Sequence, residues 1–332
     1  MKIKIEKLRN LVIKSMLNKY NKQDSELMAD VVMFGELSGR KSHGLNRLLI
    51  GSSILSMQPK SEPQIKNISK LSSLIIGNGN PGMLVGQIST NEVIRLAKHS
   101  DLGLVGTRGS FSSSGALSYY LEEITKNGLI GIIMADSPGS TAPFGGTEPL
   151  FGTNPIAFGF PTNGAPLIFD MGTSAITFGE LLNARTLGKK LSEGVAVDSD
   201  GNVTTDPQKA IDGATLSFDN SYKGVGLAMV VEILAGVLPH SGYTGIDEET
   251  NGWGNFFMAF SPKLLSDETE FKERMTKMVE RIRNSKTKDG SKVGIPGEKT
   301  LNTRDENLKN GEIEIEDKMY ELLITSINVI DT

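Results

Sequence analysis

The chain has 332 residues, of which 38% are hydrophobic and 22% charged, with a formal net charge of −4. This composition is typical of a globular protein, and the length suits two domains better than one. No basic tract runs along the sequence, so we expect no nucleic-acid partner. We find no apolar run of transmembrane length, no signal-peptide core, no histidine pair and no cysteine. These absences favour a cytoplasmic protein without a membrane partner, disulfides or a metal site.

The first seventy residues are predicted to be helical. Apolar residues recur at helical spacing over 5–16, and Asp24 is expected to cap the N-terminus of a second helix. Gly39 is expected to end that helix, because glycine is common just past a helix C-terminus. This arrangement leaves residues 42–44 in a loop and puts Arg47 at the start of a third helix.

The rest of the chain alternates between strand-like and helix-like patterns. Its 37 glycines indicate many tight turns, most of them in the middle of the sequence. The predicted strands cover 71–76, 102–105, 129–134, 155–160 and 166–170. The predicted helices cover 83–98, 223–238, 269–284 and about 316–326, and a polar linker covers 286–292.

Residues 42–47, Ser-His-Gly-Leu-Asn-Arg, place one of only three histidines four residues before an arginine. Imidazole moves protons near neutral pH, and guanidinium binds a carboxylate through two parallel hydrogen bonds. A proton donor beside a carboxylate-binding group is what reduction of a 2-keto acid requires. An exposed loop histidine near an unrelated surface arginine is the alternative, and these residues alone favour that alternative.

A glycine motif at 77–82 matches Gly-x-Gly-x-x-Gly, follows a predicted strand and precedes a predicted helix. That is the context of the dinucleotide-binding fingerprint. The next strand should then end in an acid that holds the ribose. It ends instead in Thr107 and Arg108, and Asp101 lies before it. Pro81 also removes an amide that a pyrophosphate would use. We therefore predict a structural glycine turn and no classical Rossmann site.

Small-residue turns beside apolar runs recur at 143–148, 151–155, 169–174 and 219–226. Such backbone can approach a flat or charged ligand closely, and Lys223 is placed to contact a phosphate. Each turn taken alone is better explained as a structural feature. Their order and spacing along the chain make a ligand-binding role more plausible than each turn does alone.

Together these motifs resemble the type-2 malate/L-lactate dehydrogenase family, which includes L-sulfolactate dehydrogenase, ureidoglycolate dehydrogenase and 2,3-diketo-L-gulonate reductase. The resemblance covers nearly the whole chain. The motifs that carry it are Ser-His-Gly at 42–44 with Arg47, Gly-Gly at 145–146, Gly-Thr-Asn-Pro at 152–155, Asp-Met at 170–171, Thr-Thr-Asp-Pro at 204–207, Lys-Gly-x-Gly at 223–226 and Pro-Gly-Glu at 296–298.

The resemblance implies an α+β, non-Rossmann fold like that of L-sulfolactate dehydrogenase. Residues 1–70 with 285–332 would form a helical domain for substrate binding and dimerisation, and residues 71–284 an α+β NAD(P)-binding domain. The implied activity interconverts a 2-keto acid and a 2-hydroxy acid, such as malate, lactate, ureidoglycolate or diketogulonate. The implied assembly is a homodimer, and the choice between NAD and NADP stays open.

The resemblance also assigns residue roles. His43 matches the proton donor and Arg47 a substrate-binding arginine, and we place Ser42, Ser113 and Asn154 in the same substrate site. The positions that match cofactor contacts are Ser137, Phe169, Asp170, Met171, Gly172, Thr173, Ser174, Ala175, Tyr222, Lys223, Gly297, Glu298 and Lys299.

Asp170 ends an apolar predicted strand, so we expect it to line a cleft as a second catalytic residue. A carboxylate near His43 would raise the pKa of the imidazole and keep a proton available. An aspartate that accepts hydrogen bonds from the amides of residues 172–174 is an equally good interpretation.

The sequence departs from the family pattern in two places. The family loop that carries a second histidine is here 108–115, without a histidine and with one extra residue, and Ser113 or Ser112 is the nearest equivalent. Tyr222 replaces the histidine or proline that usually precedes Lys-Gly. Either His43 alone suffices, with the serine loop shaping substrate choice, or the protein is a weakly active or non-catalytic NAD(P)H-binding relative. An unrelated phosphate- or sugar-binding enzyme is a third possibility.

Overall fold

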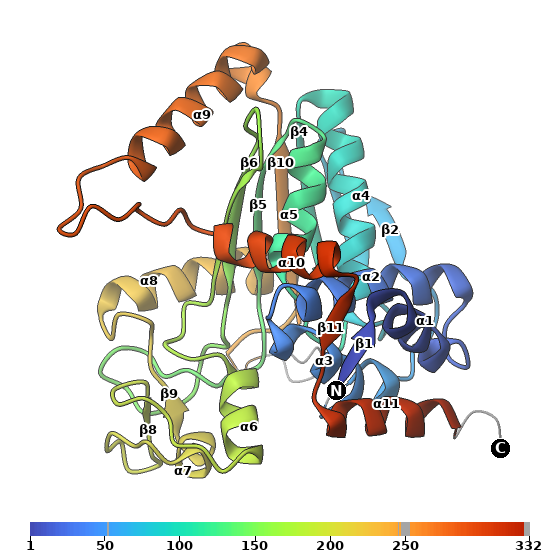
Figure 1. Ribbon diagram of the computed structural model, residues 1–332, viewed down its shortest axis with the longest axis vertical. Helices are drawn as coiled ribbons and strands as arrows, with labels where there is room; N and C mark the ends of the chain where they lie inside the picture. The colour runs from blue at the N-terminus through green and yellow to red at the C-terminus, as the bar shows by residue number, and fades with distance from the viewer. Residues whose placement is uncertain (52, 245, 247–252, 329–332) are drawn as a thin grey trace.

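The computed structural model describes residues 1–51, 53–244, 246 and 253–328 (Figure 1). Its centre is a mixed seven-stranded sheet. Only β3 and β4 are parallel, and every other neighbouring pair in this sheet is antiparallel. The strands, in the order in which they lie across the sheet, are β2 (Gln64–Asn67), β3 (Ser72–Ile76), β4 (Leu102–Arg108), β10 (Asn255–Phe260), β5 (Ile130–Ala135), β6 (Ile156–Phe160) and β7 (Leu167–Met171).

Helices cover both faces of the sheet. On one face lie α4 (Gly82–Ser100) and α5 (Leu117–Lys126), where the buried rings of Tyr120 and Phe257 meet edge to face with centroids 6.0 Å apart. On the other face, α8 (Tyr222–Val231) and the π-helix η3 (Glu232–Val237) contribute Val231 and Ala235 to a smaller apolar cluster. The α+β prediction is confirmed.

The two ends of the chain form one helical region beside the sheet (Figure 1). Strand β1 (Lys2–Lys4) pairs with β11 (Glu312–Glu314), and the Met1 amine binds the Asp317 carboxylate at 2.8 Å. The helices of this region are α1 (Ile5–Met16), α2 (Lys22–Leu37), α3 (Leu45–Leu49), α10 (Glu298–Asn310) and α11 (Asp317–Asn328). Strand β2 lies in the large sheet although it precedes residue 71, and the division into two domains stays a prediction.

A small lobe lies at one end of the sheet, and a long helix projects at the other (Figure 1). The lobe has its own apolar cluster around Leu181, Leu191, Ala196 and Ala210. Its elements are α6 (Phe178–Thr186), β8 (Ala196–Val197), α7 (Pro207–Asp212) and β9 (Ala214–Thr215), and the projecting helix is α9 (Glu268–Arg283). The short 3-10 segments of the chain are η1 (Lys41–His43), η2 (Ile54–Ser56) and η4 (Pro262–Leu264). Among the described residues, no helix combines the length and apolarity needed to span a bilayer.

Several local predictions need correction. The second helix is capped by Asn21, whose side chain accepts a hydrogen bond from the Asp24 amide at 2.9 Å, so Asp24 lies inside the first turn. The predicted helix 223–238 changes into a π-helix at Glu232. The amphipathic helices α5 and α10 were not predicted, nor was the central strand β10.

The glycine motif at 77–82 is a structural turn, as predicted. It connects β3 to α4, and the serine loop covers it. The Gly82 amide donates to Ser112 Oγ at 3.1 Å, and a β-carbon on Gly82 would overlap the Ser112 carbonyl oxygen. The Gly82 amide is therefore not open to a pyrophosphate.

Candidate active site

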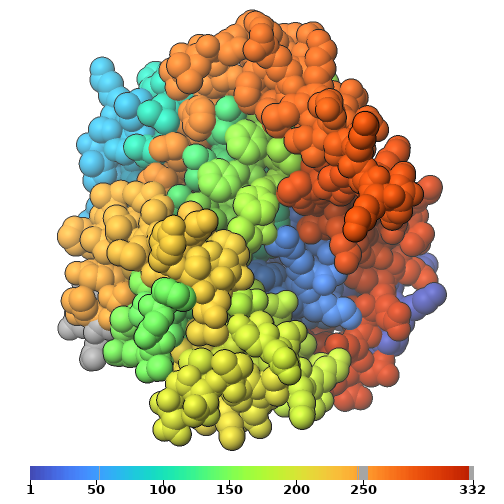
Figure 2. Space-filling view, turned by 90° about the vertical axis from the view of Figure 1, so that its left-hand side faces the viewer, coloured from blue at the N-terminus to red at the C-terminus, as the bar shows by residue number. Residues whose placement is uncertain are grey.

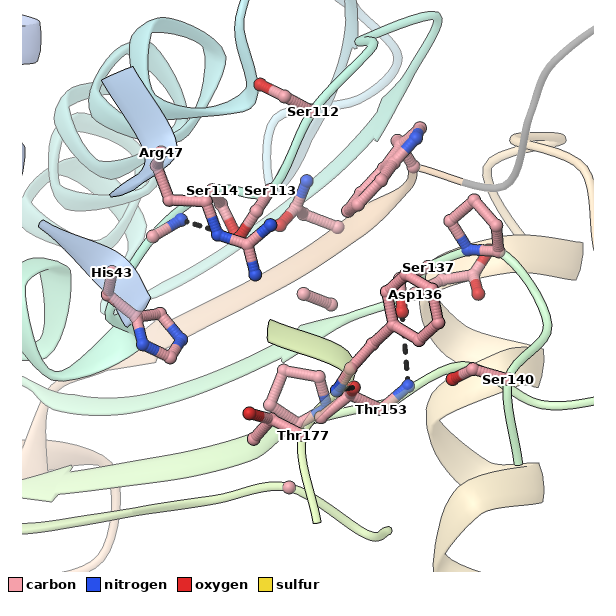
Figure 3. Close-up of a pocket in the computed structure, with 18 of the residues that line it drawn as sticks. His43, Arg47, Ser112, Ser113, Ser114, Asp136, Ser137, Ser140, Thr153 and Thr177 are labelled. Carbon is pink, nitrogen blue, oxygen red and sulfur yellow. Dashed lines mark hydrogen bonds between the residues drawn. The ribbon is translucent and has the colours of Figure 1, made fainter. Parts of the chain in front are cut away.

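A cavity of about 500 Å³ lies where the helical region meets the ends of several sheet strands. In Figure 2 the blue N-terminal segment is visible between the lime and orange-red parts of the chain, and Figure 3 shows the cavity itself. The lining residues are Arg40, His43, Arg47, Phe111, Ser112, Ser113, Ser114, Gly115, Ala135, Asp136, Ser137, Pro138, Gly139, Ser140, Thr153, Pro155, Asp170, Met171, Gly172, Thr177, Phe178, Trp253 and Asn255.

The segment that carries His43 is held against helix α2. The buried Glu36 carboxylate accepts a hydrogen bond from the Leu45 amide at 3.0 Å. Gly44 makes this contact possible, because a β-carbon there would overlap Glu36 Oε2. The 3-10 turn η1 is therefore fixed between α2 and α3, which directs His43 and Arg47 to the same cavity.

His43 lies in an environment that opposes a positive charge. Its Nδ1 atom is 3.0 Å from the Ser42 hydroxyl. Burial, with smaller contributions from the charges of Arg47 and Arg40, lowers the pKa of His43 from 6.5 to about 3. The expectation that a carboxylate raises this pKa is therefore wrong, and His43 is neutral near pH 7.

Arg47 has no ion pair with any described carboxylate. Its Nε atom donates to the Ser42 carbonyl oxygen at 3.0 Å, and its remaining guanidinium nitrogens point toward the cavity (Figure 3). Burial lowers the pKa of Arg47, although an arginine stays charged under any physiological condition. A half-buried, unpaired guanidinium on a cavity wall is a strong site for an anion.

Asp170 lines the same cavity but pairs with a different cation. Its Oδ2 atom accepts from Arg40 Nη1 at 2.9 Å and from the Ser118 amide at 3.1 Å. None of the described hydrogen bonds joins it to the amides of residues 172–174. Asp170 thus partly neutralises Arg40, one of the two arginines that lower the pKa of His43.

The residues that match cofactor contacts come from distant parts of the chain and meet around β7. A β-carbon on Gly297 would overlap the carbonyl oxygen of Ile168, within that strand. The amide of Phe218, just before α8, donates to the Thr173 carbonyl at 2.9 Å. On the neighbouring side, the Ser137 hydroxyl accepts from the Thr153 amide at 3.2 Å.

Not all of these side chains are open to a ligand. Ser137, Asp170, Met171 and Gly172 line the cavity, and Phe169, Tyr222, Lys223 and Lys299 are exposed. Thr173 and Ser174 are buried, with hydroxyls that donate to the carbonyls of Asn154 and Ile176. Ala175 donates its amide to the Leu216 carbonyl, and Glu298 pairs with Arg283.

The predicted substrate residues also separate into two groups. Ser113 lines the cavity, and its hydroxyl accepts from the Gly115 amide at 3.1 Å. Ser42 contacts both His43 and Arg47. Asn154 is fully buried behind the wall, where its amide nitrogen donates to Glu232 Oε2 at 2.7 Å.

Sequence reasoning missed Arg40, Asp136, Glu232 and Trp253. Asp136 follows an apolar strand as Asp170 does, and this shared pattern was a usable signal. Glu232 is the one carboxylate inside the apolar run 223–238, which was a second usable signal. Arg40 and Trp253 show no comparable pattern, because only the tertiary structure brings them to the cavity.

This fold is a non-Rossmann mixed sheet, and its cavity places an unpaired arginine beside a neutral histidine. The chain belongs to the malate/L-lactate dehydrogenase family, whose model matches residues 3–324, and it is an oxidoreductase. It is 32% identical to L-sulfolactate dehydrogenase of Methanocaldococcus jannaschii over 331 residues, which covers 97% of this chain and 95% of the relative. The ureidoglycolate dehydrogenase (NAD(+)) of Escherichia coli O157:H7 is 27% identical, with coverage of 98% and 95%.

Solved structures agree with this assignment. The sulfolactate dehydrogenase from Methanocaldococcus jannaschii superposes with a TM-score of 0.87 and 31% identity, covering 100% of this chain and 98% of that one. The malate dehydrogenase from Pyrococcus horikoshii OT3 superposes with a TM-score of 0.86 and 28% identity, with coverage of 99% and 95%. The predicted L-sulfolactate dehydrogenase-like fold is confirmed.

Proposed function

We propose that this protein is an NAD(P)-dependent oxidoreductase that interconverts a 2-keto acid and the matching 2-hydroxy acid. One observation carries the proposal: the unpaired guanidinium of Arg47 and the imidazole of His43 face a cavity around which the predicted cofactor residues meet. Arg47 supplies a partner for the substrate carboxylate. His43 supplies a group that exchanges a proton at the neighbouring oxygen.

The cavity residues suit a nicotinamide nucleotide. Gly172 lines the cavity and leaves room there for the Thr153 side chain, and Ser137 provides a hydroxyl at the cavity wall. Lys223 and Lys299 are exposed cations on segments that adjoin β7, where phosphates would find counter-charges. The bound nicotinamide would supply or accept the hydride, which no side chain of this protein can do.

The atom of His43 that exchanges a proton with the substrate is assigned as Nε2. Nδ1 is engaged by the Ser42 hydroxyl, so Nε2 is the atom left to face the substrate oxygen. Neutral His43 is ready to accept the proton when a hydroxy acid is oxidised. In the reductive direction, a substrate carboxylate on Arg47 offsets the charge that helps to lower the pKa of His43, and so favours its protonation.

Two copies of the chain are proposed to form a homodimer through α8 and η3. Helix α8 lies at the edge of the molecule in the view of Figure 1. Together with η3 and the residue that follows it, α8 exposes several large apolar side chains. Contiguous exposed apolar surface of this kind is typical of permanent homodimer interfaces. The exposed residues are Leu227, Met229, Val230, Ile233, Val237 and Leu238.

Fluorescence titration with NADH and NADPH, followed by a panel of 2-keto acids, tests the function. The panel contains the oxidised forms of lactate, malate and sulfolactate, and ureidoglycolate is tested in the oxidative direction. We expect saturable binding of at least one cofactor and turnover of at least one acid. Binding without turnover on a broad panel would support the non-catalytic alternative, and absence of binding would refute the proposal.

A further inference from the structure

Two buried carboxyl groups face each other at the cavity wall. Asp136, at the end of β5, is 2% exposed, and Glu232, the first residue of η3, is 5% exposed. The Asp136 carboxylate lies against η3, because a β-carbon on Gly236, four residues after Glu232, would stand 3.0 Å from Asp136 Oδ2, and the two carboxyl groups interact directly. Figure 3 places Asp136 and Ser137 on the side of the cavity away from His43 and Arg47.

The hydrogen-bond partners of this pair leave room for only one negative charge. Glu232 accepts from Asn154 Nδ2 at 2.7 Å and from the Thr244 amide at 2.9 Å. Among the described groups, neither oxygen of Asp136 accepts a hydrogen bond of normal geometry, and the nearby Ser137 amide, which lowers the pKa of this carboxyl, is the smallest of the influences on it. Two desolvated carboxylates in contact cannot both be ionised.

Charged groups from other elements do not relieve the pair. The ionisable residues that share the cavity are Arg40, His43, Arg47 and Asp170, and Arg40 is already paired with Asp170. Burial raises the pKa of Asp136 to about 10, and the charge of Glu232 adds to this effect. Burial also raises the pKa of Glu232.

Hydrogen bonds connect the pair to the cofactor side of the cavity. The Asp136 amide donates to the Gly254 carbonyl at 2.9 Å, which anchors the end of β5. The next residue, Ser137, accepts from the Thr153 amide at 3.2 Å. Asn154, held by Glu232, accepts at its carbonyl from the Thr173 hydroxyl at 3.0 Å.

We propose that Asp136 and Glu232 are positioning residues that share one proton, and that this proton holds Ser137 and the 153–154 segment in the shape that binds the nicotinamide cofactor. The cofactor part rests on the proposed function. The sharing of a proton does not, because it follows from two carboxyl groups in contact.

Alkaline pH should weaken cofactor binding in the parent protein. Once the shared proton is lost, the two carboxylates repel each other, and the contact between the end of β5 and η3 weakens. Asp136→Asn should remove this weakening, since its amide has nearly the same shape and donates permanently to Glu232. Asp136→Ala should weaken binding at every pH, because it leaves no donor.

The experiment measures the dissociation constants of NADH and NADPH by fluorescence between pH 6 and 10.5. We expect the parent to lose tenfold or more in affinity above pH 9, Asp136→Asn to change less than threefold, and Asp136→Ala to bind tenfold more weakly throughout. Glu92→Gln is the matched control, because Glu92 is a buried acid on α4 that pairs with Arg95 away from the cavity. The dissociation constants of Glu92→Gln should change with pH as those of the parent do.

The positioning role is overturned if Asp136→Asn keeps the alkaline loss, or if it binds no better than Asp136→Ala. A second readout needs no cofactor. Above about pH 4 the unfolded carboxyls release protons that the folded pair keeps, so stability falls as the pH rises toward 10. The melting temperature of Asp136→Asn minus that of the parent should therefore increase by several degrees from pH 5 to pH 9.

The two readouts separate the two proposals. A parent that binds neither cofactor at any pH would refute the proposed function and, with it, the positioning role. The melting series would still decide whether the proton is shared, and a constant difference in melting temperature across pH would overturn that sharing.

Discussion

The positive charge of Arg47 contributes to the low pKa of His43, and this effect can be measured at the scale of single residues. Arg47→Met should raise the pKa of His43 from about 3 toward its ordinary value, because one of the two nearby positive charges is gone while the burial remains. NMR titration of the imidazole resonances checks this shift. His99 and His240 serve as internal controls, and an unmoved His43 resonance would contradict the assigned coupling.

His43→Ala tests the proton-transfer role. We expect kcat to fall about 100-fold or more, the range typical of losing a positioned acid or base, while the affinity for NAD(P)H stays within about threefold. Steady-state kinetics and fluorescence titration provide the two numbers. Turnover close to that of the parent would show that another group moves the proton.

Arg47→Lys tests the carboxylate grip. An ammonium group cannot form two parallel hydrogen bonds with a carboxylate, so KM for the keto acid should rise by tenfold or more. The rates on a keto acid and on its keto amide should also become similar. If the variant distinguishes acid from amide as well as the parent does, the carboxylate binds elsewhere.

At the scale of elements, the contact between α2 and the His43 turn sets the geometry of the site. Gly44→Ala should push the turn away from α2, because the added methyl group overlaps the Glu36 carboxylate. We expect a fall in kcat of tenfold or more and a melting temperature lower by several degrees, in line with overpacking a tight contact.

Gly164→Ala is the matched control for this substitution. Gly164 lies in an exposed turn, where the nearest heavy atom to an added β-carbon is Thr162 Oγ1 at 4.0 Å. It should leave kcat and the melting temperature nearly unchanged. An equal loss in both variants would mean that the Gly44 contact has no special role.

At the scale of the whole molecule, the exposed apolar surface of α8 and η3 predicts the assembly. Ile233→Glu puts a charge at the centre of this surface and should convert a dimer into a monomer, because an unpaired charge is costly inside an apolar interface. Light scattering after size-exclusion chromatography measures the mass. Ile65→Glu, on the exposed strand β2, is the control and should leave the mass unchanged.

Much of the fold follows from local patterns. The spacing of apolar residues predicts α1, α2, α4 and α9 to within a few residues, since a helix depends mainly on its own periodic face. Strands β3 to β7 follow from short apolar runs bounded by glycine and proline. The central strand β10 was not predicted, although its apolar run at 256–260 lies between Gly254 and Pro262, which was a usable signal.

The order of the sequence motifs was enough to identify the family and the two residues, His43 and Arg47, on which the proposed chemistry depends. The pairing of Asp170 with Arg40, the neutral imidazole and the contact of Asp136 with Glu232 became evident from the folded chain alone. Motifs are local in the chain, whereas desolvation and charge–charge contacts depend on residues that lie far apart in it, such as Arg40 and Asp170, which are 130 positions apart.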